Sequence, residues 1–236
     1  MKRDGVGTGV DRAVQPDEPA QSDPQQAVFS DFAVPDAIRI NKVERFVTAW
    51  FHDSVRDLAV LELGIAPGGL AERLLVKGAS CYGVDINKRS MPGILFKQWD
   101  LNIGIPDFGR AFDVIFAGEV IEHVIDDAAF LRNCANALRS GGILGITTPN
   151  LAFSLNRLRL LAGRVPLFAY APYHYHIYTV STLKRMVEDA GLITVGIKGS
   201  HVLFSRRRHR TGLIFEAAAD HFPTIAAHII LFALKP

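Results

Sequence analysis

Short, almost wholly apolar runs alternate with amphipathic segments along most of this chain, and no other feature constrains its fold as strongly. Helical spacing of apolar residues occurs at 70–77, 127–138 and 181–190, the last with Ser181 as the expected N-cap. Apolar runs without alternation indicate a parallel sheet that is buried on both faces. The expected strands are 59–63, 80–87, 94–102, 112–120, 143–150, 192–199 and 228–234, with a Ser-Gly-Gly break at 140–142 before the fifth.

The 236 residues suffice for one sizeable α/β domain. Residues 1–35 are rich in Asp, Gln, Pro and Gly and are predicted to form a disordered tail. A domain is therefore expected over 36–236. It would open with an amphipathic helix at 36–53 that covers the sheet or the mouth of its site. Residues 151–179, where the alternation stops, are expected to form a lid over the substrate pocket.

Composition narrows the class of protein. A net charge of +2 gives no argument for nucleic acid as a partner. Cys81 and Cys134 lie in apolar segments and are expected to be buried free thiols, as in a reducing compartment. The N-terminus lacks the pattern of a signal peptide, and no uninterrupted apolar run approaches the ~20 residues of a membrane-spanning helix. These observations predict a cytoplasmic location.

The turn "LELGIAPGGL" joins the first strand to the first helix of the alternation. Glycines there let backbone amides approach a ligand, and a helix start attracts a carboxylate or phosphate. Asp85 ends the next strand, where an acidic side chain can accept the hydroxyls of a ribose. The pair predicts a site for a nucleoside-containing cofactor. Two alternatives stay open: a turn without a ligand, and a dinucleotide site, because Gly64, Ala66 and Gly69 nearly fit that glycine pattern.

Six motifs occur in the order seen in class I S-adenosylmethionine-dependent methyltransferases: "LELGIAPGG", "YGVDIN", "WDLN", "FDVIFAGEVIEHV", "LRSGGILGITTPN" and "HIYTVSTLKRMVEDAGL". From residue 36 onward the chain resembles this class, and within it the O-methyltransferases of ubiquinone biosynthesis and of glycan gene clusters. The resemblance implies a Rossmann-like three-layer sandwich with a seven-stranded, mostly parallel sheet whose last strand is antiparallel.

The resemblance also implies which residues bind S-adenosylmethionine. Asp85 would hold the ribose, and Glu119 would lie beside the methionyl group. Ala66 replaces the family's middle glycine, and the "APGG" turn resembles that of ribosomal-RNA ribose methyltransferases, whose lysine-centred catalytic set is not seen here. The full implied cofactor set is Glu62, Gly64, Ala66 and Gly68 around the amino-acid part, Asp85 at the ribose, Asp100 and Leu101 at the adenine, and Glu119.

The motif "EVIEH" supplies Glu119, Glu122 and His123, which would share one face if the segment is helical. Two carboxylates and an imidazole can bind a divalent ion. Methyltransferases of small-RNA termini resemble this chain here, which implies a Mg²⁺ set of Glu119, Glu122, His123 and His176, with His176 aligning better than His174. The alternative is that Glu119 faces the cofactor, Glu122 is a solvated helix residue and His123 caps or packs. Without a metal, His123 or His176 is the candidate general base. The expected catalytic residues are His123, His176 and Glu122.

The predicted lid carries aromatic and basic residues that bear on the acceptor. The aromatic side chains can stack on a sugar or an aromatic ring or form the lid's own core, and they are Phe153, Phe168, Tyr170, Tyr173 and Tyr175. The basic residues Arg157, Arg159 and Arg164 lie among leucines, a pattern that suits a solvated face, a membrane surface or a lipid-linked phosphate. Arg206–Arg210, "RRRHR", is the densest basic cluster and reads as a solvated loop or a phosphate contact.

The prediction from sequence is a methyltransferase that uses S-adenosylmethionine to O-methylate a small molecule, such as a glycan, lipid-linked or quinone-like intermediate. An RNA ribose 2′-O-methyltransferase is the first alternative, although no basic groove interleaved with aromatic residues supports it. A cofactor-binding protein without catalysis is the second. A nicotinamide-dependent oxidoreductase has no hydride-transfer site to support it.

Overall fold

The computed structural model describes residues 36–169, 171, 173–202 and 217–236. These residues belong to one compact unit, Ala33–Pro236. The predicted tail at 1–35, Tyr170 and the Arg206–Arg210 cluster lie outside the described residues. No helix in the described part of the chain is long and apolar enough to cross a membrane.

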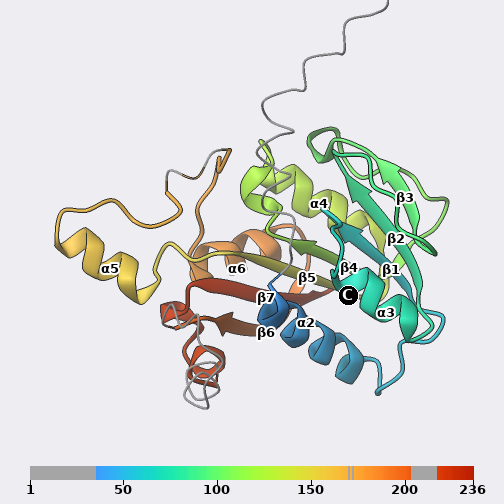
Figure 1. Cartoon of the computed structure of the whole chain (residues 1–236), viewed down its shortest axis with the longest axis horizontal. Coiled ribbons are helices and arrows are strands. Elements are labelled where there is room, and N and C mark those ends of the chain that lie inside the picture. The colour runs from blue at the N-terminus through green and yellow to red at the C-terminus, as the bar shows by residue number, and fades with distance from the viewer. Residues whose placement is uncertain (1–35, 170, 172, 203–216) are drawn as a thin grey trace, which may run out of the picture. The chain divides into compact units, whose positions relative to one another are not determined.

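Seven strands form a single sheet in the order β3-β2-β1-β4-β5-β7-β6 (Figure 1). All neighbours from β3 to β5 pair in parallel, whereas β7 runs antiparallel to both β5 and β6. This confirms the fold class expected from the sequence. The strands are β1 (Ala59–Leu63), β2 (Ser80–Asp85), β3 (Leu95–Gln98), β4 (Phe112–Gly118), β5 (Leu138–Pro149), β6 (Ile193–Ser200) and β7 (His228–Leu234).

Helices cover both faces of the sheet. α2 (Ala37–Trp50) and α3 (Leu70–Val76) pack on one face, and α4 (Asp127–Ala137) and α6 (Val180–Asp189) pack on the other. Successive residues of β1 show the division, because Val60 joins the core under α2 and α3 and Leu61 joins the core under α4 and α6. α5 (Ser154–Leu161) extends away from the sheet (Figure 1). Three short 3₁₀ helices are η1 (Leu101–Ile103), η2 (Ile121–His123) and η3 (Pro223–Ile225).

Two expected boundaries differ from the structure. The strand β5 begins at Leu138, so the Ser-Gly-Gly segment lies inside it, where the register against β4 shifts between Phe112 and Val114. The glycines therefore accommodate an irregularity within a strand instead of ending an element. Thr179, not Ser181, caps α6, because its side chain and that of Thr182 form a reciprocal capping box. Cys81 and Cys134 are buried and free, as expected.

The helix α2 packs on the sheet and also reaches the site. Asp36 caps its first turn by accepting hydrogen bonds from the amides of Ile38 and Arg39. Midway along it, Phe46 stacks on Phe232 of β7 with ring centroids 3.7 Å apart. Lys42 donates to the Gly199 carbonyl at the end of β6 over 2.7 Å. These contacts fix the start of α2 at the carboxyl end of the parallel strands.

Candidate active site

The turn after β1 holds a backbone that only glycine adopts easily. Gly64 has φ +70°, and a Cβ there would lie 2.6 Å from Cγ2 of Val120. The amides of Gly64 and Ile65 both donate to the carbonyl of Val84, which ties the turn to β2. Gly68, φ +78°, has open space where a Cβ would lie. The turn therefore leaves room beside Gly68 and brings Gly64 against the segment that follows β4.

Glu62 is buried at the end of β1 and caps α3. Its carboxylate accepts hydrogen bonds from the amides of Ala71 (2.7 Å) and Leu70 (3.3 Å). Burial raises the pKa of Glu62 to about 7, although both hydrogen bonds favour the charged form. The carboxylate of Glu62 is thus the anion that binds the amides at the start of α3, and its hydrogen bonds hold the turn between β1 and α3 in place.

Asp85 and Asp100 lie at the same edge of the sheet. Asp85 ends β2, accepts from the amide of Asn87 over 2.7 Å, and lies 3.4 Å from a guanidinium nitrogen of Arg89. Burial raises its pKa, against the lowering effects of both partners. Asp100 caps η1, and its neighbour Leu101 packs against the core. The amide of Trp99 donates to the carbonyl of Asp85, which holds the two acidic residues at adjacent strand ends.

Glu119 follows β4 in a left-handed conformation, φ +56°. Its Oε1 accepts a hydrogen bond from the hydroxyl of Thr147 (3.0 Å), and its Oε2 pairs with Arg39 of α2 (3.0 Å) and lies 3.6 Å from Nε2 of His228. Burial opposes the charge, but Arg39 and His228 outweigh it and lower the pKa of Glu119. Glu119 is therefore an ionised residue held by α2, β5 and β7.

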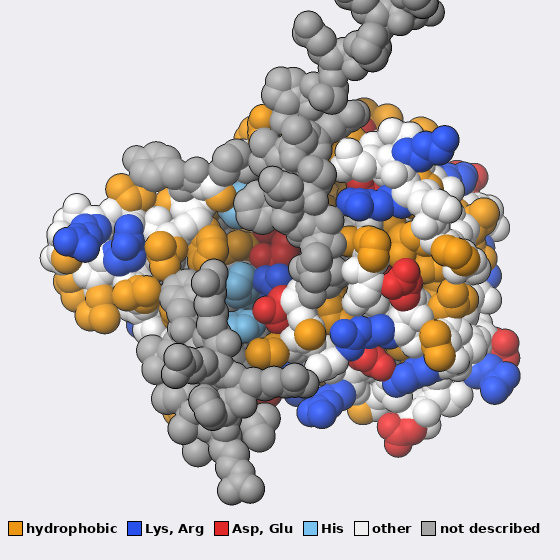
Figure 2. Space-filling model, in the orientation of Figure 1, with side chains coloured by type: hydrophobic (Ala, Val, Ile, Leu, Met, Phe, Trp, Pro, Cys, Tyr) orange, Lys and Arg blue, Asp and Glu red, His pale blue; other side chains and the backbone are white. Residues whose placement is uncertain are grey.

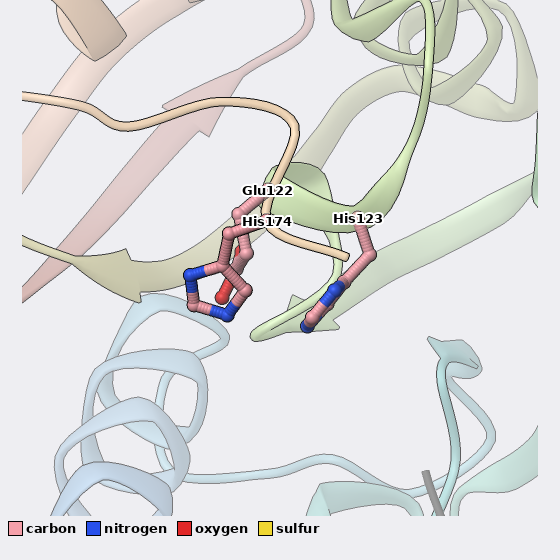
Figure 3. Close-up of side chains that lie close together, drawn as sticks. All are labelled: Glu122, His123 and His174. Atoms are coloured by element: carbon pink, nitrogen blue, oxygen red, sulfur yellow. The ribbon is translucent and has the colours of Figure 1, made fainter. Parts of the chain in front are cut away.

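The sequence spacing places Glu119, Glu122 and His123 on one helix face. In the structure, Glu122 and His123 do not share a face with Glu119. Residues Ile121–His123 form a 3₁₀ turn, and Glu119 precedes that turn in a left-handed conformation. Glu122 and His123 instead meet His174, from the segment between α5 and α6 (Figure 3). One ligand atom from each of Glu122, His123 and His174 lies within 4.8 Å of the others. We call these three residues the His–Glu cluster.

The His–Glu cluster contains a carboxylate that is only half satisfied. Oε2 of Glu122 accepts from the hydroxyl of Thr148 over 3.0 Å, while Oε1 is buried without a hydrogen-bond partner among the described residues. Burial, reinforced by the charge of Glu119, raises the pKa of Glu122 well above its usual value. A buried lone oxygen of this kind calls for a proton or a cation.

The two histidines of the cluster are held in their neutral form. Nδ1 of His123 lies 3.0 Å from the carbonyl of Tyr173, so it carries the proton and Nε2 is the basic nitrogen. Burial lowers the pKa of His123, and burial together with His123 lowers that of His174. The rings meet edge to face with centroids 4.7 Å apart.

His176 lies outside the His–Glu cluster, contrary to the metal set that the sequence implied. Its Nε2 lies 3.1 Å from the carbonyl of Ile125, and its Nδ1 lies 3.5 Å from the carboxylate of Asp127. The amide of Tyr175 meanwhile donates to the carbonyl of Glu122 over 2.8 Å. His176 therefore ties the segment before α6 to η2 and α4, and this places His174 inward.

Sequence reasoning missed Arg39 and His228. His228 begins β7 beside Glu119, and burial lowers its pKa to about 4. Neither residue belongs to a recognisable motif, since each reaches the site only through the packing of α2 and β7. Of the seven non-glycine residues with positive φ in the described part of the chain, four lie around this edge of the sheet: Glu119, Phe168, Tyr173 and His201. Backbone of this kind persists where surrounding contacts enforce it and is enriched at functional sites. Histidine side chains accompany acidic and basic ones in the middle of the face in Figure 2.

The fold and the position of the site together define a Rossmann-like protein that binds its ligand beyond the carboxyl ends of the strands. A family model described as a methyltransferase domain matches residues 11–195. The chain belongs to this family of class I methyltransferases, which use S-adenosylmethionine.

Similar proteins support this assignment. The chain is 30% identical over 151 residues to a ubiquinone biosynthesis O-methyltransferase of Parvibaculum lavamentivorans, covering 58% of this chain and 59% of the relative. It is 26% identical to the protein of the same name from a Chelativorans strain, covering 70% of this chain and 65% of the relative. The chain thus spans about three fifths of the length of these curated relatives. A 1,6-didemethyltoxoflavin-N1-methyltransferase of Burkholderia thailandensis shares the fold, with a TM-score of 0.58, 15% identity, and 93% of each chain covered.

Proposed function

We propose that this protein transfers the methyl group of S-adenosylmethionine to a hydroxyl of a small molecule. The observation that carries the proposal is a half-buried, neutral histidine with a fixed tautomer, His123. It lies at the carboxyl edge of a sheet whose neighbouring strand ends suit a nucleoside. Transfer to oxygen needs a proton acceptor, and His123 is positioned to serve as one. The ubiquinone-biosynthesis relatives support an oxygen acceptor of quinone-like type.

The residues at the strand ends fit the cofactor. A Cβ at Gly64 would clash with Val120, so the turn keeps its backbone close to the neighbouring segment, and open space remains beside Gly68. Asp85, buried at the end of β2, would accept the ribose hydroxyls, and Asp100 with Leu101 would face the adenine. Glu62, Ala66 and Glu119 complete the proposed surround through the turn and the end of β4. The cofactor supplies an electrophilic methyl group on a sulfonium.

In the proposed reaction the acceptor oxygen forms a bond to the methyl carbon while the carbon–sulfur bond breaks and its electron pair remains on sulfur. His123 takes the hydroxyl proton on Nε2, and the carbonyl of Tyr173 stabilises the resulting imidazolium through Nδ1. Alignment contributes most of the rate, because the methyl donor is already activated. Glu122 is a positioning residue: Thr148 donates a hydrogen bond to its carboxylate, which is thereby held beside the two histidines.

As an alternative to general-base catalysis by His123, we propose that the His–Glu cluster holds a divalent ion, in which case Nε2 of His123 is a ligand and not the proton acceptor. The unpartnered Oε1 of Glu122 and two neutral imidazoles are suitable ligands, and a cation there would favour the ionised form of Glu122. His174 takes the place that sequence reasoning gave to His176. Glu119 is occupied by Arg39 and Thr147, so the proposed set is Glu122, His123 and His174. A bound Mg²⁺ would lower the pKa of a coordinated hydroxyl.

We propose the segment 151–179 as the lid of the acceptor pocket. The part of this segment that leads back to α6 is attached to η2 and the residues after it through Tyr173, Tyr175 and His176, each by a hydrogen bond that involves the backbone. Phe168 lies with its ring centroid 5.7 Å from that of His228. The lid therefore brings an aromatic side chain and His174 to the same edge as Glu119, which suits a planar acceptor.

Calorimetric titration with S-adenosylhomocysteine tests the cofactor site. We expect micromolar binding that is lost in Asp85→Ala and retained in Asp189→Ala, an exposed aspartate at the end of α6. Methyl transfer to 3,4-dihydroxybenzoate, a catechol, then tests the reaction, and His123→Ala should lower its rate by about two to four orders of magnitude. Binding without transfer to any hydroxyl compound, unchanged by His123→Ala, would favour the non-catalytic alternative.

A further inference from the structure

The helix α5 has its polar and apolar sides reversed relative to the rest of the protein. Asn156 is its only fully buried residue, whereas Leu158 is 62% exposed and Leu161 is 86% exposed. A helix of a globular protein ordinarily turns its leucines inward and its amides outward. The leucines of α5 therefore face away from the core of their own chain.

Hydrogen bonds hold α5 in this orientation. Nδ2 of Asn156 donates to the carbonyl of Asn150 over 3.3 Å, and its Oδ1 accepts from the amide of Leu167 over 2.7 Å. Arg157 donates to the carbonyls of Ala152 and Thr224. These bonds attach α5 to the residue that follows β5, to Leu167 and to Thr224 of η3, so the leucines cannot turn inward without breaking them.

The exposed apolar residues form a stripe. Leu155, Leu158 and Leu161 recur every third residue and so lie along one side of the helix. The exposed fraction rises along that stripe to its maximum at Leu161, the last residue of α5. Leu160 and Val165 are also exposed beside it. In Figure 2 apolar and basic side chains cover the lobe that α5 occupies in Figure 1.

Basic residues flank the stripe, and acidic residues are absent from this part of the chain. At about 100° per residue, Arg157 and Arg159 fall on opposite sides of the line through Leu158 and Leu161. Arg164 follows in the exposed turn after the helix. The sequence has no Asp or Glu between Asp127 and Glu188. Leucines between arginines are the pattern of a helix that lies at the surface of an anionic bilayer.

We propose that the exposed face of α5 docks on an anionic lipid bilayer, with the leucine stripe in the headgroup–acyl boundary and the arginines at the phosphates. A second copy of the chain suits this surface less well. Each leucine contributes roughly 100 Å² of apolar surface, so the stripe supplies far less than the ~800 Å² per partner of a stable interface. A symmetric pair would also bring the arginines of both copies together.

Docking through α5 has a consequence for the candidate site, although it does not depend on the proposed reaction. The helix follows β5 directly, and the chain returns from it to place Tyr173 and His174 against η2. The chain that follows α5 therefore leads from the membrane-facing helix to the His–Glu cluster. An acceptor with an apolar tail could reach the His–Glu cluster while its tail remains in the bilayer.

Flotation of the full chain with vesicles tests the docking. We expect binding to phosphatidylcholine vesicles that contain phosphatidylglycerol, weaker binding to phosphatidylcholine alone, and loss of binding as salt is raised. The double variant Leu158→Glu/Leu161→Glu should bind at least about tenfold more weakly, since each buried leucine contributes about tenfold in affinity. The double variant Val76→Glu/Ile193→Glu adds the same charges at exposed apolar positions of α3 and β6 and should bind like the wild type.

Binding of S-adenosylhomocysteine, measured on the same samples, reports whether the variants are folded and the cofactor site is intact. The docking proposal is overturned if the leucine variant floats like the wild type, because anionic lipid would then be recognised by another basic segment. It is also overturned if the wild type does not float, or if light scattering shows that the leucines join two copies instead. Failure of cofactor binding in every sample would count against the proposed function and not against the docking.

Discussion

Nη1 of Arg39 lies 3.0 Å from Oε2 of Glu119, and this ion pair joins the first turn of α2 to the end of β4. Both side chains are mostly buried, and Glu119 also accepts a hydrogen bond from Thr147 of β5. Since the pKa of Glu119 is lowered by Arg39 and His228 against the effect of burial, the carboxylate is charged and depends on its partners. The contact thus couples the covering helix to the proposed methionyl site.

Replacing Arg39 by Gln should lower the free energy of unfolding by about 2 kcal/mol, because it leaves a largely buried carboxylate without its cation. Urea unfolding at pH 7 measures this loss. The double variant Arg39→Gln/Glu119→Gln should recover most of it, since no charge is then left unpaired. Arg132→Gln, at an exposed arginine of α4, serves as the control and should change little. Equal losses in the single and double variants would show that Arg39 acts by packing alone.

The pKa of about 7 at Glu62 predicts an unusual dependence of stability on pH. The group binds its proton more tightly when folded than when unfolded, where the pKa is about 4.5. Its contribution to stability is therefore fully present below pH 4.5 and is lost as the pH rises through 7, by about 3 kcal/mol at most. We expect the wild type to lose this amount relative to Glu62→Gln between pH 4.5 and pH 8, measured by urea unfolding. A constant difference between the two proteins across that range would refute the raised pKa.

The order of the elements could be predicted because each strand is a short apolar run in the sequence, visible without knowledge of its partners. β1 and β7 have the expected bounds, and the covering of both faces follows from the absence of alternation along the strands. The Ser-Gly-Gly segment was interpreted as a break because glycine also ends elements, and only the pairing with β4 shows that it lies within β5.

The candidate site could be predicted only in part, because long-range contacts decide it. Glu119 leaves the helical conformation where Thr147 and Arg39 hold its side chain, and neither residue is near it in sequence. His174 and His176 are two positions apart in an irregular segment, so motif spacing could not determine which one turns inward. In the structure, His174 turns inward while the amide of the next residue, Tyr175, donates a hydrogen bond to the carbonyl of Glu122.

This difference between the two histidines gives a matched test of the metal proposal. Mn²⁺ binding, followed by electron paramagnetic resonance, should be lost in Glu122→Gln and His174→Ala and kept in His176→Ala. Affinity should rise with pH, because a cation displaces the proton that the raised pKa of Glu122 retains. Loss of Mn²⁺ in His176→Ala with retention in His174→Ala would restore the set that the sequence motif implied.

The turn after β1 allows the cost of a left-handed backbone to be separated from the cost of a close contact. Gly64 and Gly109 both have φ +70°, but a Cβ would meet Val120 at Gly64 and open space at Gly109. Each Gly→Ala change should cost about 1 kcal/mol for the backbone alone. Gly64→Ala should cost a further 1–3 kcal/mol or so, because Val120 must move within a packed core.

Urea unfolding of the two alanine variants measures the difference, and titration with S-adenosylhomocysteine shows its effect on the site. We expect Gly109→Ala to bind the cofactor product like the wild type, and Gly64→Ala to bind it more weakly even at temperatures where it is fully folded. Val120 lies between Glu119 and the 3₁₀ turn of Glu122 and His123, so its displacement changes the site as well as the core. If both variants lose equal stability and bind equally well, the space at Gly64 is not limiting and the turn requires glycine only for its backbone conformation.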